Sequence, residues 1–216
     1  MRGLMLRDAL VLLRRVSLAR IAVLLVGGIL FMLFMRIAAA TLLSVILPLV
    51  AGGLMSMLAA EDDKTNWLKF VRASPARVWD VVVARYLVCG IILLATCVYT
   101  TLLNVACFLL FREQPLAVYL GVSAVGALVA YGNSLLVVPS CFSGGAAGAN
   151  LASMAFLFAA GAFAWVVRNV DLTGVLAFLA SVPVYAYVLV GVVAALLATV
   201  LSVCMSMRIC RKKTIY

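Results

Sequence analysis

Histidine is absent from the 216 residues, and acidic side chains are few. Without histidine, the chain has no His-ligated zinc site and no Ser-His or Cys-His catalytic pair. All seven carboxylates fall in predicted loops or at predicted membrane interfaces. An intramembrane aspartyl protease needs two buried carboxylates, and ion-coupled carriers place ionisable groups near the membrane midplane. These absences argue against an intramembrane enzyme and against an ion-driven carrier.

Nucleotide-binding and metal-binding motifs are also missing. The P-loop pattern G-x-x-x-x-G-K-[ST] does not occur, and the glycine-rich stretch Ser143–Asn150 lacks its lysine, so it is interpreted as a flexible turn with close helix packing. Six cysteines lie in or beside apolar segments, and none forms a C-x-x-C pair. We therefore expect no cofactor in this chain. Any uphill transport would need energy from another subunit.

Charge is scarce and apolar side chains are abundant. Charged residues make up 11% of the chain and apolar residues 68%, whereas soluble domains average about 25% and 45–50%. A soluble fold could not cover that much apolar surface with so few polar groups. The apolar runs are long and continuous, which favours membrane-spanning helices over barrel strands. The sequence predicts an all-α membrane protein with a single domain over residues 1–216.

Six transmembrane helices are predicted from the apolar runs. Residues Met1–Arg20 precede them as an amphipathic elbow helix lying in the membrane interface. A turn is predicted at Arg112–Pro115, a small-residue loop at Pro139–Asn150, and a re-entrant or interfacial segment at Leu172–Val182, before span 6. The predicted spans are Ile21–Met35, Ala38–Ala60, Val81–Phe111, Leu116–Val138, Leu151–Val167 and a last span that Pro183 opens and Met207 ends.

Basic residues are distributed unequally between the two sides of this arrangement. All of the 17 lysines and arginines except Arg36, Arg112 and Arg168 fall on the side that holds both chain ends. Cytoplasmic loops of membrane proteins carry an excess of lysine and arginine. We therefore expect both termini in the cytoplasm, and the plasma membrane of a bacterium as the location.

A few hydroxyl and amide side chains lie inside the predicted spans. Thr96, Thr100 and Asn104 recur every four residues and share one face of the third span, and Asn133 lies in the fourth. These four residues could line a translocation path. They could equally form hydrogen bonds between packed helices.

The longest polar stretch, Glu61–Asp80, is predicted to be cytoplasmic. Trp67, Phe70 and Val71 are apolar residues among charges, at a spacing that suits a short amphipathic helix, and Pro75 breaks that helix. An exposed aromatic face surrounded by charge is typical of a docking element. An interfacial helix anchored by its tryptophan is the alternative.

Residues Met55–Leu87 resemble the small permease subunits of type-2 ABC exporters. In that family, an acidic cluster ends the second span and is followed by a tryptophan, a short helix, a proline and a basic-tyrosine pair. The matching residues here are Glu61, Asp62, Trp67, Phe70, Pro75, Arg85 and Tyr86. An arginine often stands third after the proline, where this chain has Val78, with Arg77 one place earlier. The role of Arg77 is therefore left open.

The resemblance implies a membrane subunit that is not itself an enzyme. Two copies, or one copy and a paralogue, would form the permease, and two separate ABC ATPase subunits would bind ATP and Mg beneath it. Trp67 and Phe70 would be buried anchors in the ATPase, with Lys69 at the rim. The implied ATPase-binding residues are Glu61, Asp62, Trp67, Phe70, Val71, Arg72 and Pro75, and the implied translocation path is Thr96, Thr100, Asn104 and Asn133.

The cargo is predicted less narrowly. An apolar path with hydroxyl and amide groups suits amphipathic peptides, and it also suits other hydrophobic compounds or lipids. The alternative function is a non-transport membrane protein that assists assembly or regulation, which would bind a different partner and leave ATP turnover unchanged.

Overall fold

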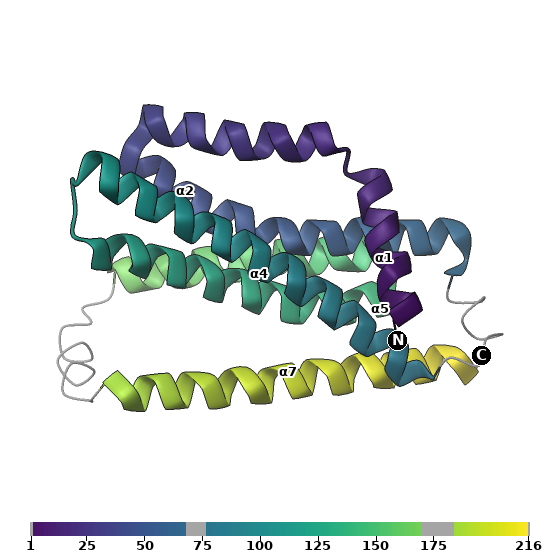
Figure 1. Ribbon diagram of the computed structural model, residues 1–216. Coiled ribbons are helices and arrows are strands. Elements are labelled where there is room, and N and C mark those ends of the chain that lie inside the picture. Colours follow the sequence, from purple (N-terminus) through teal and green to yellow (C-terminus); the bar gives the residue numbers. More distant parts are fainter. Residues whose placement is uncertain (1, 68–76, 170–183, 216) are drawn as a thin grey trace.

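The computed structural model describes residues 2–67, 77–169 and 184–215, and this part of the chain is all helical (Figure 1). Four of its helices are long and apolar enough to cross a membrane. The all-α membrane class predicted from the sequence is thus confirmed. The helices are α1 (Arg2–Arg15), α2 (Leu18–Thr65), α4 (Val78–Phe111), α5 (Leu116–Asn169) and α7 (Val184–Ile215).

Helix α2 consists of two arms. It has 48 residues, whereas one membrane crossing takes about 20. At Arg36 the backbone leaves the helical region, with φ 48° and ψ −121°, and the chain doubles back there (Figure 1). The arms are residues 18–35 and 37–65, so the break predicted at Arg36 is confirmed. Pro48 lies inside the second arm without ending it.

Helix α5, with 54 residues, is also broken once, at Gly144 and Gly145. The loop predicted over Pro139–Asn150 is wrong, because every other residue of that stretch is helical. Gly145 has φ +59°, a conformation that glycine adopts without steric cost. The Ala146 amide, at the start of the second arm, donates to an Asp63 carboxylate oxygen at 3.3 Å. Two glycines and this cap are enough to reverse the chain.

The remaining boundaries follow the predictions more closely. Helix α4 runs unbroken for 34 residues to Phe111, and the αL conformation of Arg112 opens the predicted turn before Pro115. Helix α7 continues past Met207 to Ile215, so the basic residues expected in a tail extend the helix by two turns. The segment Leu172–Val182 and Pro183 lie outside the described residues.

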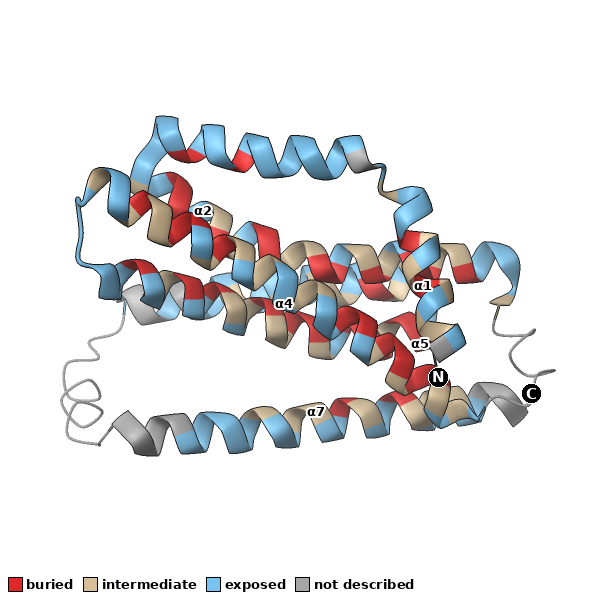
Figure 2. Cartoon of the chain, in the orientation of Figure 1, coloured by how far each residue is buried: buried red, intermediate tan, exposed pale blue. Residues whose placement is uncertain are grey.

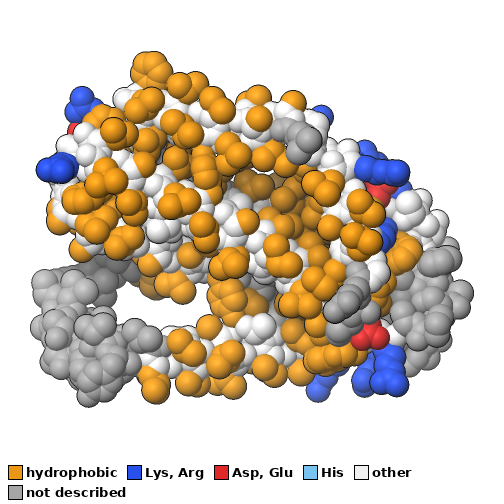
Figure 3. All heavy atoms as spheres, in the orientation of Figure 1, with side chains coloured by type: hydrophobic (Ala, Val, Ile, Leu, Met, Phe, Trp, Pro, Cys, Tyr) orange, Lys and Arg blue, Asp and Glu red, His pale blue; other side chains and the backbone are white. Residues whose placement is uncertain are grey.

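The helices bury their inward faces and leave the rest of the surface apolar (Figure 2). Helix α2 packs most extensively against α5. One core cluster contains Met55, Leu58 and Val137, and a second contains Leu103 and Tyr119. In the space-filling view, hydrophobic side chains cover the middle of the molecule and charged groups gather at its two ends (Figure 3). This distribution suits a lipid environment.

Gly126 sets the distance between α5 and the second arm of α2. A Cβ atom at this position would overlap the backbone carbonyl of Ser44. Gly126→Ala is expected to lower the free energy of unfolding by about 1–3 kcal/mol, as overpacking does. Gly53→Ala is the matched control, because a Cβ there meets nothing within 4 Å. Unfolding midpoints in detergent measure the difference, and equal midpoints for the two variants would contradict this packing.

Candidate functional site

Buried charges gather where three helices meet at one end of the molecule. Helix α1 crosses the last turns of α2 and the first turns of α4 there (Figure 1). Asp8 of α1, Asp62 of α2 and Arg85 of α4 are 5%, 7% and 3% exposed. Charged side chains are almost never buried this fully unless they are paired. The contacts of these three residues therefore define the site.

Four residues form this site, and we call Arg7, Asp8, Asp62 and Arg85 the ion cluster. Arg85 Nη2 donates to Asp62 Oδ2 at 2.5 Å, and Arg85 Nε lies 3.2 Å from Asp8 Oδ2. Arg7 Nη1 donates to Asp62 Oδ1 at 2.6 Å and to Asp8 Oδ1 at 3.0 Å. Two cations thus neutralise two anions, and charge-assisted hydrogen bonds of this kind are the strong ones. The cluster holds α1, α2 and α4 in one arrangement.

Contacts around the ion cluster extend it toward the residues that precede segment 68–76. The Arg7 guanidinium lies 4.2 Å from the ring centroid of Trp67, within the range of a cation–π interaction. Arg15 of α1 pairs with Glu61. The next residue, Asp62, belongs to the ion cluster. The Asp63 carboxylate accepts from the Ala146 amide at the start of the second arm of α5. The last turn of α2 therefore contacts α1, α4 and α5 at this end.

Helix α2 extends five residues beyond Ala60, where the second span was predicted to end. Residues 61–65 form the last turn of α2, and Asn66, with φ 49°, caps it through bonds to the carbonyls of Asp62 and Asp63. The acidic cluster therefore lies at the end of α2, and the coupling segment predicted to follow it stays a prediction. Phe70, Val71, Arg72 and Pro75 lie outside the described residues.

The structure places the two acidic residues predicted to bind an ATPase within the chain's own contacts. Asp62 is buried and bonded to two arginines, and Glu61 is half-buried beside Arg15. Trp67 is half-buried against Arg7. Direct contact of these residues with an ATPase stays a prediction. In the structure, these three residues attach the end of α2, just before segment 68–76, to α1 and α4.

The opposite end of the molecule carries less charge. Arg36 pairs with Glu113 at 2.8 Å, with the two side chains 60% and 31% exposed. The Arg36 guanidinium also lies over the Phe111 ring at 5.3 Å. This pair ties the break in α2 to the turn after α4. Exposed pairs of this kind contribute about 0–1 kcal/mol, so the buried ion cluster dominates the electrostatics.

The residues predicted to line a path are mostly bonded between or within helices. Asn104 is 1% exposed, and its Nδ2 donates to Ser44 Oγ at 2.6 Å and to Ser123 Oγ at 2.5 Å. Thr96 and Thr100 donate to carbonyl oxygens of their own helix, α4. Asn104 thus joins α2, α4 and α5, which is the interhelical role left open by the sequence.

Asn133 is buried as deeply as Asn104. It is 2% exposed, and its Oδ1, like that of Asn104, has no hydrogen-bond partner among the described residues. The side chain packs so close to Gly52 that a Cβ there would lie 2.6 Å from Asn133 Nδ2. A Cβ at position 52 would therefore force the Asn133 amide to shift.

Asn104→Leu distinguishes the two interpretations of the polar face. Loss of the interhelical bonds is expected to lower the free energy of unfolding by about 1 kcal/mol, as for other polar contacts between membrane helices. Ser44 and Ser123 keep bonds to their own backbone carbonyls, so neither hydroxyl is left unpaired. Thr96→Val, which removes only a bond within one helix, is the control. Unchanged stability in Asn104→Leu, measured by unfolding in detergent, would contradict the interhelical role.

Several contacts of the site have no signal in the sequence. Asp8 and Arg85 are far apart in the chain, and Tyr86 bonds to Ser202 at 2.5 Å and to Ser206 at 3.0 Å on α7. Asp8 is the one acidic residue among the basic residues of positions 1–20, which could have marked it as a partner for a buried cation. The partners of Tyr86 could not be found this way.

Together, the fold and the buried charges define a multi-pass helical membrane protein whose helices are fixed to one another at one end. The family model described as ABC-2 family transporter protein matches residues 3–211. The chain belongs to this family, whose members are transmembrane subunits of ABC transporters and imply an ATPase partner. Searches of curated proteins and of solved structures gave no match.

Proposed function

We propose that the chain is the membrane subunit of an ATP-driven exporter, working with separate ATPase subunits. The ion cluster is the observation that carries this proposal. It joins α1, α2 and α4 immediately before and after segment 68–76. Force applied to that segment would reach three helices at once. A bound nucleotide would bias such an interface between two arrangements.

Six membrane crossings are proposed for the chain. Each of α2 and α5 is longer than two crossings of about 20 residues, and each has one break between two arms. With α4 and α7 the arms make six apolar rods, and α1 would lie in the interface as the elbow helix. The end with the ion cluster also carries Lys64 and the basic end of α7. This asymmetry supports cytoplasmic termini and a bacterial plasma membrane.

Residues 61–75 would seat in the ATPase, with Trp67 and Phe70 as anchors. Aromatic side chains dominate the binding energy of such contacts. ATP and Mg would be held by the ATPase, two copies of which would serve a permease dimer formed with a second copy or a paralogue. The cargo would be an amphipathic peptide or another hydrophobic compound, because the membrane part of the chain is apolar with scattered hydroxyl and amide groups.

Purification of the tagged full chain from its native membranes in mild detergent tests the proposal. A soluble ATPase with a P-loop is expected to co-purify in near-stoichiometric amount, and its identity follows from its mass. A chain that is intact and folded but carries no ATPase would overturn the proposal. The alternative, a membrane protein that assists assembly or regulation with another partner, would then be the favoured function.

A further inference from the structure

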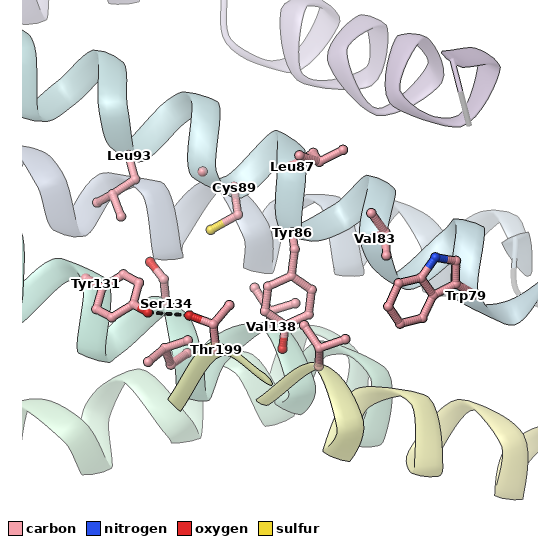
Figure 4. Close-up of a pocket in the computed structure, with 13 residues that line it drawn as sticks. Trp79, Val83, Tyr86, Leu87, Cys89, Leu93, Tyr131, Ser134, Val138 and Thr199 are labelled. Atoms are coloured by element: carbon pink, nitrogen blue, oxygen red, sulfur yellow. Dashed lines mark hydrogen bonds between the residues drawn. The ribbon is translucent and has the colours of Figure 1, made fainter. Parts of the chain in front are cut away.

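An apolar crevice separates α7 from α4 and α5, away from the ion cluster. Two cavities of about 330 Å³ and 720 Å³ adjoin each other along it and share Gly90, Leu93, Tyr131 and Thr199. The first runs from Trp79 past Val83 and Tyr86, as the close-up shows (Figure 4). In the space-filling view, an opening separates the first part of α7 from the helices above it (Figure 3). The crevice is long, narrow and open to the side.

Hydroxyl groups along the crevice already have partners within the chain. Tyr131 donates to the Ala195 carbonyl at 2.8 Å and lies 2.5 Å from the Thr199 hydroxyl (Figure 4). Tyr86 is paired with serine hydroxyls of α7. Ser134 donates to the carbonyl of Ala130. The walls therefore offer a ligand apolar contact rather than hydrogen bonds.

A hydrocarbon chain is the occupant that such walls fit. The rim residues Leu94, Leu128 and Leu196 are more than half exposed, so the crevice opens where lipid surrounds the protein. An empty crevice would forgo dispersion contacts along its whole length. Water is a poor occupant, because the hydroxyl groups of the walls are already bonded within the chain. An acyl chain that enters from the bilayer makes these dispersion contacts and needs no hydrogen bonds.

One end of the crevice is electrically suited to an anionic headgroup. Trp79, half exposed at that end, is a residue type enriched at the membrane interface. Val203 of α7 lines the same end, and the next turns of α7 carry the exposed basic residues Arg208, Arg211 and Lys212. Asp80 follows Trp79 in the first turn of α4 and offsets one of these charges. The remaining positive charge attracts a lipid phosphate.

We infer that this crevice is a binding site for one anionic phospholipid. An acyl chain lies between α4, α5 and α7, and the phosphate contacts the basic end of α7. The site would fasten α7, where most residues of 189–201 are exposed, to the rest of the molecule. This inference concerns a resident lipid and does not depend on the proposed transport function.

Quenching of Trp79 fluorescence by brominated lipid tests the inference on the full chain. Trp67→Phe and Trp165→Phe leave Trp79 as the single tryptophan of the chain. The protein is reconstituted in phosphatidylcholine vesicles with a small fraction of either brominated phosphatidylglycerol or brominated phosphatidylcholine. We expect a relative binding constant at least roughly fivefold higher for phosphatidylglycerol, falling toward one at high salt, since each basic residue near the headgroups strengthens anionic lipid binding about fivefold.

Variants that fill the crevice test where the lipid binds. Gly90 lines both cavities, and a Cβ there meets nothing within 4 Å, so Gly90→Leu projects into the crevice. Ala195→Leu fills it from α7. Gly53→Leu is the matched control, a helical glycine in open space outside the crevice. The preference for phosphatidylglycerol should vanish in both crevice variants and persist in the control.

Removal of the basic side chains tests where the headgroup lies. In the variant Arg208→Gln, Arg211→Gln and Lys212→Gln, we expect equal quenching by the two lipids. Equal quenching in the parent protein would overturn the inference, because the crevice would then not select an anionic phospholipid. So would a preference that survives either crevice variant in folded protein. A preference that survives the triple glutamine variant would overturn the headgroup assignment.

Discussion

Arg85→Met is expected to lower the free energy of unfolding by about 3–5 kcal/mol, the usual cost of removing one partner of a buried ion pair. The substitution leaves the buried carboxylates of Asp8 and Asp62 with one cation, Arg7, between them. Methionine occupies a similar volume, so loss of packing contributes little. Reversible unfolding in mixed detergent micelles, followed by circular dichroism, measures the change.

Two further variants separate charge from other effects. Glu113→Gln breaks the exposed pair with Arg36 at the other end and should cost no more than about 1 kcal/mol. Adding Asp8→Asn to Arg85→Met removes the one excess negative charge, leaves Arg7 paired with Asp62 and should restore part of the lost stability. If Arg85→Met is no less stable than Glu113→Gln, the ion cluster does not hold the helices together.

Trp67→Ala and Phe70→Ala are each expected to weaken binding of the ATPase at least about tenfold, since buried aromatic anchors carry 2 kcal/mol or more. Together they should abolish co-purification with the ATPase. The readout is the dissociation constant between the purified full chain in detergent and the ATPase that co-purifies with the parent protein. ATP turnover stimulated by the chain should fall in parallel.

A structural effect of Trp67→Ala is small by comparison. The residue contacts Arg7 through a cation–π interaction, whose loss costs about 0.5–1 kcal/mol in stability. Trp165→Ala removes an exposed tryptophan from the second arm of α5 and should leave binding unchanged. Normal binding by the double alanine variant would contradict docking through this segment.

Helix class and most helix ends could be predicted because they depend on local sequence. Long apolar runs specify membrane helices, and the break at Arg36 lies where a charge interrupts such a run. The stretch Pro139–Asn150 misled because glycine and proline signals are weaker in membrane helices, where neighbouring helices re-satisfy the backbone. Helix α2 ends five residues later than predicted, since the acidic residues there bind partners that the sequence does not reveal.

The ion cluster depends on contacts between distant residues. Arg7 and Asp62 are 55 positions apart, and Asp62 and Arg85 are 23 apart. Charges in an amphipathic helix normally face headgroups, so the burial of Asp8 was not predicted, although its place as the one acidic residue of positions 1–20 was a signal. The polar face of α4 shows the converse. Its four-residue spacing was visible in the sequence, but the choice between a path and helix contact required Ser44 and Ser123 to be placed beside Asn104.

The ion cluster also has a consequence for biosynthesis. A chain is made from its N-terminus at about 5–20 residues per second, so Arg7, Asp8 and Asp62 are complete before Arg85. Those three side chains together carry one excess negative charge, and burying it unpaired would be costly. Arg85 supplies the missing cation when α4 emerges. Helices α1 and α2 thus carry an unneutralised negative charge until α4 is made. This charge favours the packing of α4, through Arg85, against α1 and α2 in the nascent chain.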